Sequence, residues 1–144
     1  MELKNGTILR FKTKVGDYGY ARVLNKAPAG HYIEMFDYFN MDGNLELDKL
    51  ENRLMYPKIL DTYSVIETAT TDTWSIEHVP THEYECPDAK EIIFSIGVKG
   101  DEKYENILGE PVTQIDGKDY AEMAFENEAH IEFIVDFLRK KKGL

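Results

Sequence analysis

The first 40 residues alternate between apolar and polar side chains in short runs, and turn-forming residues separate the runs. The segments Thr7–Thr13 and Tyr18–Leu24 alternate in this way, with Val15-Gly16-Asp17 between them. A period of two residues is typical of a β-strand, because successive side chains point to opposite faces of the sheet. The chain is therefore predicted to begin with two short strands joined by a turn.

A third strand is predicted over His31–Phe39, after the turn Pro28-Ala29-Gly30. Tyr32 and Phe36 fall on one face of this segment, and Ile33 falls on the other. Apolar residues on both faces indicate a central strand that is covered on both sides.

A short helix is predicted after this strand. Leu47, Leu50 and Leu54 recur at helical spacing, Asn44 is available as the N-cap, and Tyr56-Pro57 ends the segment.

The second half of the chain contains further strand-like runs around polar loops. Residues 80–90 and 99–118 are predicted to be mainly loop, because Pro or Gly recurs in them. The predicted strands are Tyr63–Thr68, Thr73–Val79, Glu91–Val98 and a shorter piece near Val112–Ile115.

An amphipathic helix near the C-terminus is the most clearly marked element. Asn127 can cap its first turn, and the bases Arg139–Lys142 suit the negative end of the helix dipole. We expect the face that bears Ile131, Ile134, Val135 and Leu138 to share one core with Trp74. Phe133 and Phe137 widen this apolar stripe.

These elements predict an α+β fold in a single domain that spans residues 1–144. We expect a mostly antiparallel, strongly twisted sheet of five to seven short strands. One short central helix and the C-terminal amphipathic helix complete the fold, and the latter should pack on the sheet.

The cysteine content and the start of the chain indicate a cytoplasmic protein. Cys86 is the single cysteine of the 144 residues, so no internal disulfide is possible. The residues after Met1 do not show the pattern of a signal peptide, and the apolar runs are too short to span a bilayer. We therefore expect no membrane association.

Charge is distributed unevenly along the chain, which has a formal net charge of −10. Residues 1–30 hold six Lys/Arg and two Asp/Glu, whereas residues 31–138 hold seven Lys/Arg and 25 Asp/Glu. An acidic surface repels nucleic acids and attracts basic partners. The simpler interpretation is that the acids only confer solubility.

Catalytic and metal-binding patterns are weak. His78, His82 and Cys86 are spaced four apart and could hold a metal on a helix, but Pro80 and Pro87 interrupt the segment. We favour an exposed polar loop. Cys86 beside either histidine is a conceivable nucleophile–base pair, but no orienting third group accompanies it. We therefore expect neither an enzyme nor a cofactor.

One pattern resembles a known family. The opening Gly6–Phe11, the aromatic strand Tyr18–Leu24 that ends in Arg-Val-Leu, and the aromatic strand Tyr32–Phe39 resemble the immunity protein 26 family of bacterial polymorphic toxin systems. Asp72-Thr73-Trp74-Ser75-Ile76 is similar to the tryptophan strand of that family. The resemblance is carried mainly by Arg22 and Trp74, within about the first 80 residues. Their structural interpretations are a sheet-edge arginine paired with an acid and a core-filling tryptophan.

The resemblance implies an immunity protein of contact-dependent growth inhibition, which binds and neutralises a cognate toxin domain, such as a nuclease, in a stoichiometric complex. It implies no catalysis. The free protein is expected to be a monomer or a weak dimer. One alternative is an acidic regulatory or adaptor module that binds a basic protein without a toxin. The other alternative is a small-ligand binder or an enzyme.

The acids that we expect to contact the toxin fall in two groups, one in the predicted short helix and one in the loop 80–90. Within each group the carboxylates lie close to one another, within about two helical turns in the first group and within one loop in the second. They are Glu46, Asp48, Glu51, Glu83, Glu85 and Asp88.

Overall fold

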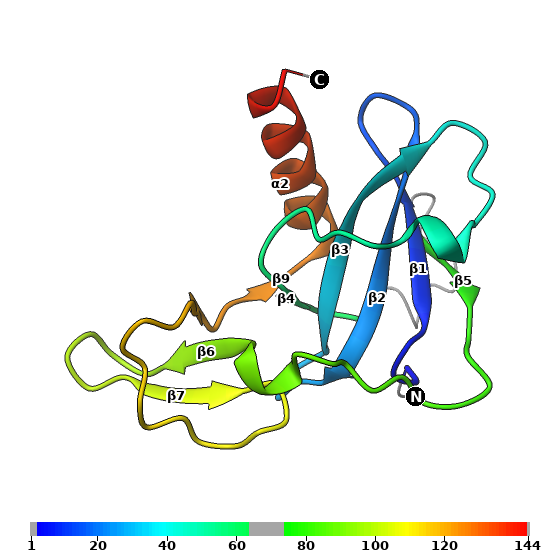
Figure 1. The fold of residues 1–144 in the computed structure, drawn as a ribbon. Coiled ribbons are helices and arrows are strands. Elements are labelled where there is room, and N and C mark those ends of the chain that lie inside the picture. Colours follow the sequence, from blue (N-terminus) through cyan, green and yellow to red (C-terminus); the bar gives the residue numbers. More distant parts are fainter. Residues whose placement is uncertain (1–2, 64–73, 144) are drawn as a thin grey trace.

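The α+β fold is confirmed by a computed structural model, which describes residues 3–63 and 74–143 (Figure 1). The strands in these residues are β1 (Ile8–Lys12), β2 (Tyr18–Lys26), β3 (His31–Asn40), β4 (Lys58–Leu60), β5 (Trp74–His78), β6 (Ile93–Ile96), β7 (Lys103–Asn106), β8 (Ala121–Glu122) and β9 (Phe125–Glu126). The helical elements include two 3₁₀ turns, η1 (Leu47–Lys49) and η2 (Ala89–Glu91), and the C-terminal helix α2 (Glu128–Lys141).

The strands form two sheets. The larger has the order β5-β1-β2-β3-β4-β9 and is antiparallel except for the pair β4–β9. The smaller has the order β7-β6-β8, with β8 parallel to β6. The predicted predominance of antiparallel pairing is therefore confirmed. The β6–β7 hairpin extends to one side of the larger sheet, and α2 rises from the end of β9 (Figure 1).

The inner face of the larger sheet, which we define as the face that packs against α2, forms one hydrophobic core. Trp74 is buried there and stacks on Phe11 with ring centroids 4.7 Å apart. Ile131 and Val135 of α2 are fully buried in the same cluster. The predicted shared core of Trp74 and the last helix is thus confirmed. Leu138 packs against its margin.

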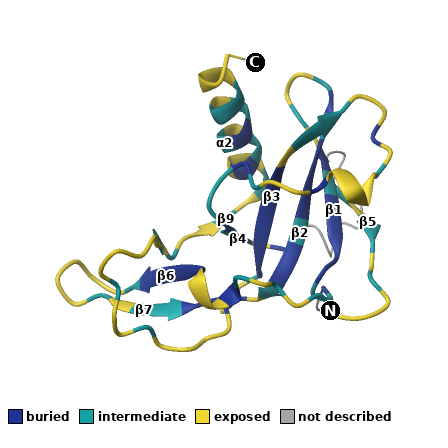
Figure 2. Cartoon of the chain, in the orientation of Figure 1, coloured by how far each residue is buried: buried dark blue, intermediate teal, exposed yellow. Residues whose placement is uncertain are grey.

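The outer face of the same sheet, opposite α2, is covered by the segment that follows β3. Tyr20 and Phe36 form a second buried cluster there with Leu50 of that segment. Since Ile33 of β3 is buried on the inner face, β3 is covered on both sides, as predicted (Figure 2).

A third cluster joins the two sheets. Leu24 and Tyr32 of the larger sheet pack with Phe94 of β6 and Ile107. The Asn25 side chain on β2 also donates a hydrogen bond of 2.8 Å to the Ile107 carbonyl. Burial of these residues ties the smaller sheet to the lower end of β2 and β3.

Some predicted elements differ from the structure. The central helix is only the 3₁₀ turn η1, because Glu46, and not Asn44, precedes it without a side-chain cap, and the backbone leaves the helical conformation at Leu50. No strand forms over Val112–Ile115, and the preceding residue, Pro111, makes an isolated bridge to Glu105. Apart from Tyr63, the predicted strand Tyr63–Thr68 lies outside the described residues.

No helix among residues 3–63 and 74–143 is long and apolar enough to cross a membrane.

Replacement of Ile131 by Ala should lower the free energy of unfolding by about 2–5 kcal/mol, because the substitution leaves a cavity beneath α2. Phe137 lies on the exposed side of the same helix with 56% of its surface accessible, so Phe137→Ala should change stability by less than about 0.5 kcal/mol. Urea denaturation of both variants measures the difference. An equal loss of unfolding free energy in the two variants would contradict the observed orientation of α2.

Candidate functional site

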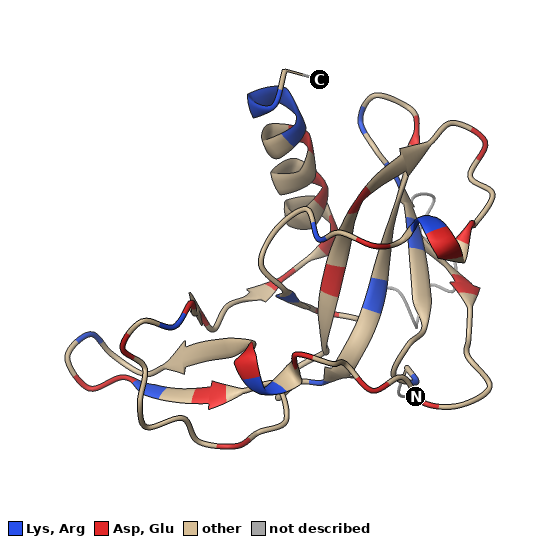
Figure 3. Ribbon diagram, viewed as in Figure 1, with Lys and Arg blue, Asp and Glu red and all other residues tan. Residues whose placement is uncertain are grey.

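Charged residues of both signs are spread over the strands and the connecting loops, and Lys and Arg gather at the C-terminal end of α2 (Figure 3). Several of the basic residues near α2 are paired internally. Arg139 makes two hydrogen bonds to the Asp17 carboxylate, of 2.9 and 2.8 Å, and Lys142 pairs with Asp37 at 3.2 Å. The Arg139–Asp17 pair therefore joins the end of α2 to the turn between β1 and β2.

The outer face of the sheet carries the most connected group of charged residues. Arg22 on β2 and Glu34 on β3 are direct cross-strand partners, and the Arg22 Nη1 lies 3.2 Å from the Glu34 Oε2. Opposite charges at such positions stabilise a strand pair. Glu34 is 5% exposed, so its carboxylate requires partners that compensate for lost hydration.

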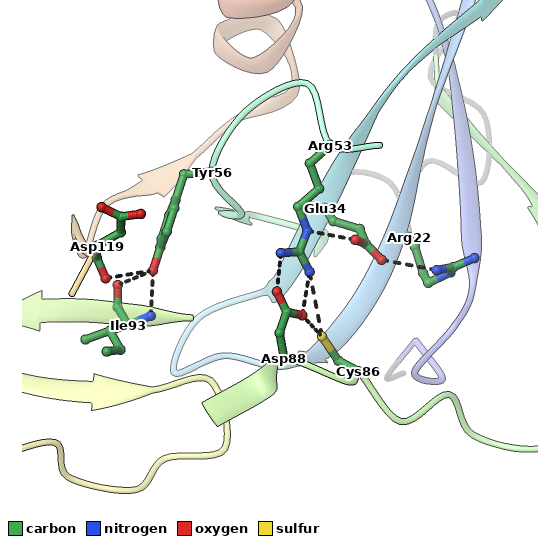
Figure 4. A network of polar contacts seen from close by, with 8 residues as sticks. All are labelled: Arg22, Glu34, Arg53, Tyr56, Cys86, Asp88, Ile93 and Asp119. Carbon is green, nitrogen blue, oxygen red and sulfur yellow. Dashed lines mark hydrogen bonds and ion pairs between the residues drawn. The ribbon is translucent and has the colours of Figure 1, made fainter. Parts of the chain in front are cut away.

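Arg53 supplies the second partner and extends the group to the loop before η2 (Figure 4). Its Nε donates to the Glu34 Oε1 at 2.9 Å. Its Nη1 and Nη2 donate to the two oxygens of Asp88 at 2.6 and 2.9 Å, which is a bidentate pair. Through these hydrogen bonds, Arg53 connects its own segment, after η1, and the loop that contains Asp88 to the same face of the sheet.

The electrostatics of this network follow from its contacts. Hydrogen bonds from Arg53 lower the pKa of Asp88 from 3.8 to about 2, against the opposing effect of burial. Burial, with the hydrogen bond from the thiol to Asp88, raises the pKa of Cys86 to about 11. Asp88 is thus charged at neutral pH and Cys86 is a neutral thiol, which makes it a poor nucleophile.

Arg22 contacts two aromatic rings. Its guanidinium carbon lies 5.2 Å from the Phe36 ring centroid and 4.4 Å from that of Tyr84. The predicted pairing of Arg22 with an acid is confirmed, but its placement at a sheet edge is wrong because β2 lies between β1 and β3. The stacking fixes Tyr84, and with it the acidic loop, over the strands.

Five of the six acids predicted as contacts are exposed. None of their carboxylates has a hydrogen-bond or ion-pair partner within the described part of the chain. The first group surrounds η1, which precedes the Arg53 attachment, and the second group flanks Tyr84, so both border the outer face. The five are Glu46, Asp48, Glu51, Glu83 and Glu85.

Asp88 differs from these five because both of its oxygens accept hydrogen bonds from Arg53. Its charge is balanced, and its role in the structure is to hold the loop in place.

The arginines of the outer face do not offset the exposed acids. Arg10 pairs with Glu77 at 3.2 Å and donates to the Gly43 carbonyl at 2.7 Å. Arg22 and Arg53 are engaged with Glu34 and Asp88, as described above. Exposed Lys49 and Lys90 offset part of the negative charge, and the remainder gives this face an acidic potential.

The histidine–cysteine segment does not form a metal site. No group of three or more His, Cys, Asp or Glu residues in residues 3–63 and 74–143 is arranged to hold a metal ion. His78 lies at the end of β5, whereas Cys86 is turned toward Asp88 and Arg53.

Another hollow lies between the β6–β7 hairpin and the segment 120–125. It measures about 840 Å³ and is open to solvent. Its charged residues are of mixed sign, Lys99, Glu102 and Glu122, and one Glu102 oxygen is occupied by the Gly100 amide at 2.6 Å. No arrangement of a base beside a nucleophile is present among these lining residues.

Arg53 was missed by sequence reasoning, although it is central to the network. The chain carries few bases between residues 31 and 138, and an isolated Arg in an acidic segment was a usable signal for an ion pair. Its partners Glu34 and Asp88 lie 19 and 35 residues away, and no local periodicity relates them.

A scan of protein-family models found no match to this chain, and neither did searches of curated proteins and of solved structures. The resemblance to the immunity protein 26 family therefore stays a prediction.

Replacement of Asp88 by Asn should destabilise the protein at pH 7, because it removes the charge that Arg53 faces. The pKa of Asp88 is lowered on folding, so the stability from this carboxylate is fully present above about pH 4. It is lost as the pH falls through about 2. Urea denaturation between pH 7 and 2 should therefore show a wild-type advantage that shrinks below pH 4.

Glu85→Gln is the matched control, because Glu85 is exposed and lies in the same loop. It should change the free energy of unfolding by less than about 0.5 kcal/mol across the range. A wild-type advantage over Asp88→Asn that did not vary with pH would argue against the ion pair.

Proposed function

We propose that this protein is a cytoplasmic immunity protein that binds and neutralises the toxin domain of a bacterial polymorphic toxin system in a one-to-one complex. The toxin domain is proposed to present a basic surface, as the active cleft of a nuclease does. The observation that carries the proposal is the outer face, where five exposed carboxylates surround Arg10, Arg22 and Arg53, which are already paired with acids.

The internal pairing of these arginines supports recognition of a basic partner. An unpaired arginine among the acids would repel such a partner, whereas a paired one leaves the acidic potential in place. The ion pairs also fix the two acidic segments before binding, so less conformational entropy is lost when the complex forms. A rigid acidic surface favours both rapid association and specificity.

The first test is co-expression of the protein with the toxin domain encoded by the neighbouring gene. Cells that carry both should survive, and cells that carry the toxin alone should die. If the two populations die equally, the immunity proposal is wrong. Retention of a basic host protein without protection would then favour the alternative, an acidic adaptor module without a toxin.

The second test reverses charge on the outer face. The triple variant Glu46→Lys, Asp48→Lys and Glu51→Lys should slow association with the toxin domain by about tenfold or more at 0.01 M salt. The difference from wild type should diminish at 0.1 M salt, since the Debye length shortens from ~30 to ~10 Å. Stopped-flow fluorescence measures both rates.

The matched control reverses three exposed acids on the side of the smaller sheet, Asp101, Asp116 and Asp119. It changes the net charge by the same amount, so it separates the position of the charges from their sum. An equal loss in both triple variants would mean that only the net charge of the protein matters.

A further inference from the structure

A pocket of about 400 Å³ adjoins the acidic loop on the outer face. Its base is apolar, with Leu24 of β2, Ala89 of η2 and Ile107 each less than 10% exposed. Tyr84 and Glu83 stand on its loop side. The pocket therefore combines an apolar base with a rim that belongs to one of the two acidic groups.

The neutral polar groups of the pocket wall bond to the protein itself. The Asn25 amide donates to the Ile107 carbonyl at 2.8 Å, and the Asn5 amide donates to the Asn25 Oδ1 at 3.4 Å. The Cys86 thiol donates to Asp88 at 3.1 Å.

Two charged residues line the pocket in the described part of the chain, and both are acidic. Glu83 and Glu85 have no hydrogen-bond or ion-pair partner among the described residues, so their oxygens are available at the rim. An occupant with a positive charge would meet both carboxylates, whereas an anion would be repelled.

The wall that carries these carboxylates is fixed before any ligand binds. Tyr84 is stacked on Arg22, and Asp88, three residues after Glu85, is fastened by Arg53. Because these contacts already immobilise the loop, binding requires little further ordering.

We infer that this pocket receives a lysine or arginine side chain from the basic partner, an inference that rests on the proposed function. The aliphatic stem of such a side chain would contact Leu24 and Ile107, and its charged head would lie between Glu83 and Glu85 at the rim. Long cationic side chains bind in this manner, with an apolar stem buried and the charge kept at the surface. The pocket is thus an anchor point within the acidic face.

The first experiment titrates ¹⁵N-labelled protein with N-acetyl-arginine amide and N-acetyl-lysine amide by NMR. Shifts should concentrate at Leu24, Tyr84, Ala89 and Ile107. The variant Glu83→Gln/Glu85→Gln should weaken binding by about fivefold or more. N-acetyl-citrulline amide, which has nearly the same shape without the charge, should produce no such shifts.

The matched control is Glu46→Gln/Glu51→Gln, which removes two exposed acids near η1 and leaves the pocket unchanged. It should bind both amides as the wild type does. Equal weakening by the two double variants, or equal binding of the citrulline compound, would overturn the pocket assignment.

The second experiment measures dissociation of the complex with the toxin domain encoded next to this gene. Glu83→Gln/Glu85→Gln should accelerate dissociation by about tenfold or more, since the bound partner would cover the rim and exclude water from the charge pairs there. Unchanged dissociation, with no binding of the amides, would overturn the pocket and leave the immunity function intact. Binding of the amides without any complex would instead refute the immunity function.

Discussion

The buried carboxylate of Glu34 is the constraint on which the outer face depends. It lies on a central strand, and transfer of an unpaired carboxylate out of water would be strongly unfavourable. Arg22 from the neighbouring strand and Arg53 from a later loop compensate for this transfer. Arg53 then binds Asp88, so that one buried acid determines the position of two loops.

The two faces of the larger sheet are stabilised by different physical means. On the inner face, Trp74, Phe11 and the buried side of α2 remove apolar surface from water. On the outer face, burial of Tyr20 and Phe36 is combined with charge-assisted hydrogen bonds. The inner face therefore supplies most of the apolar burial, and the outer face supplies directional contacts that fix the loops. This division separates the main core from the face on which we propose recognition.

Recognition on this face would combine long-range attraction with a defined anchor. The exposed carboxylates near η1 and on the loop act at a distance, and their effect is screened by salt. The pocket beside Tyr84 acts only in contact, because its base is apolar and its rim is charged. A partner with basic residues at random positions would be attracted at long range, but it would not place a cationic side chain in the pocket. The network around Arg53 links the long-range attraction to the pocket, since it positions the loop whose acids contribute to both.

The sequence alone determined the elements that depend on local periodicity. Alternation defined β1, β2 and β3, and the apolar stripe with its Asn127 cap defined α2, because these signals arise within a few residues of one another. The exposed polar loop that holds Glu83 and Glu85 was also predicted, since it follows from local composition. The short helix was overestimated: Leu50 and Leu54 are buried separately, Leu50 over the outer face and Leu54 on the inner side.

Only the tertiary structure decided the parallel pairings of β4 with β9 and of β6 with β8, the ion-pair network and the pocket. Each joins residues far apart in the chain, as when Arg53 meets Asp88 or Leu24 meets Ile107. Such contacts are selected by the burial and charge balance of the whole fold, and no pattern within a short window encodes them. The local sequence determined which segments became strands and helix, and long-range packing determined which of their charges were neutralised and which stayed available to a partner.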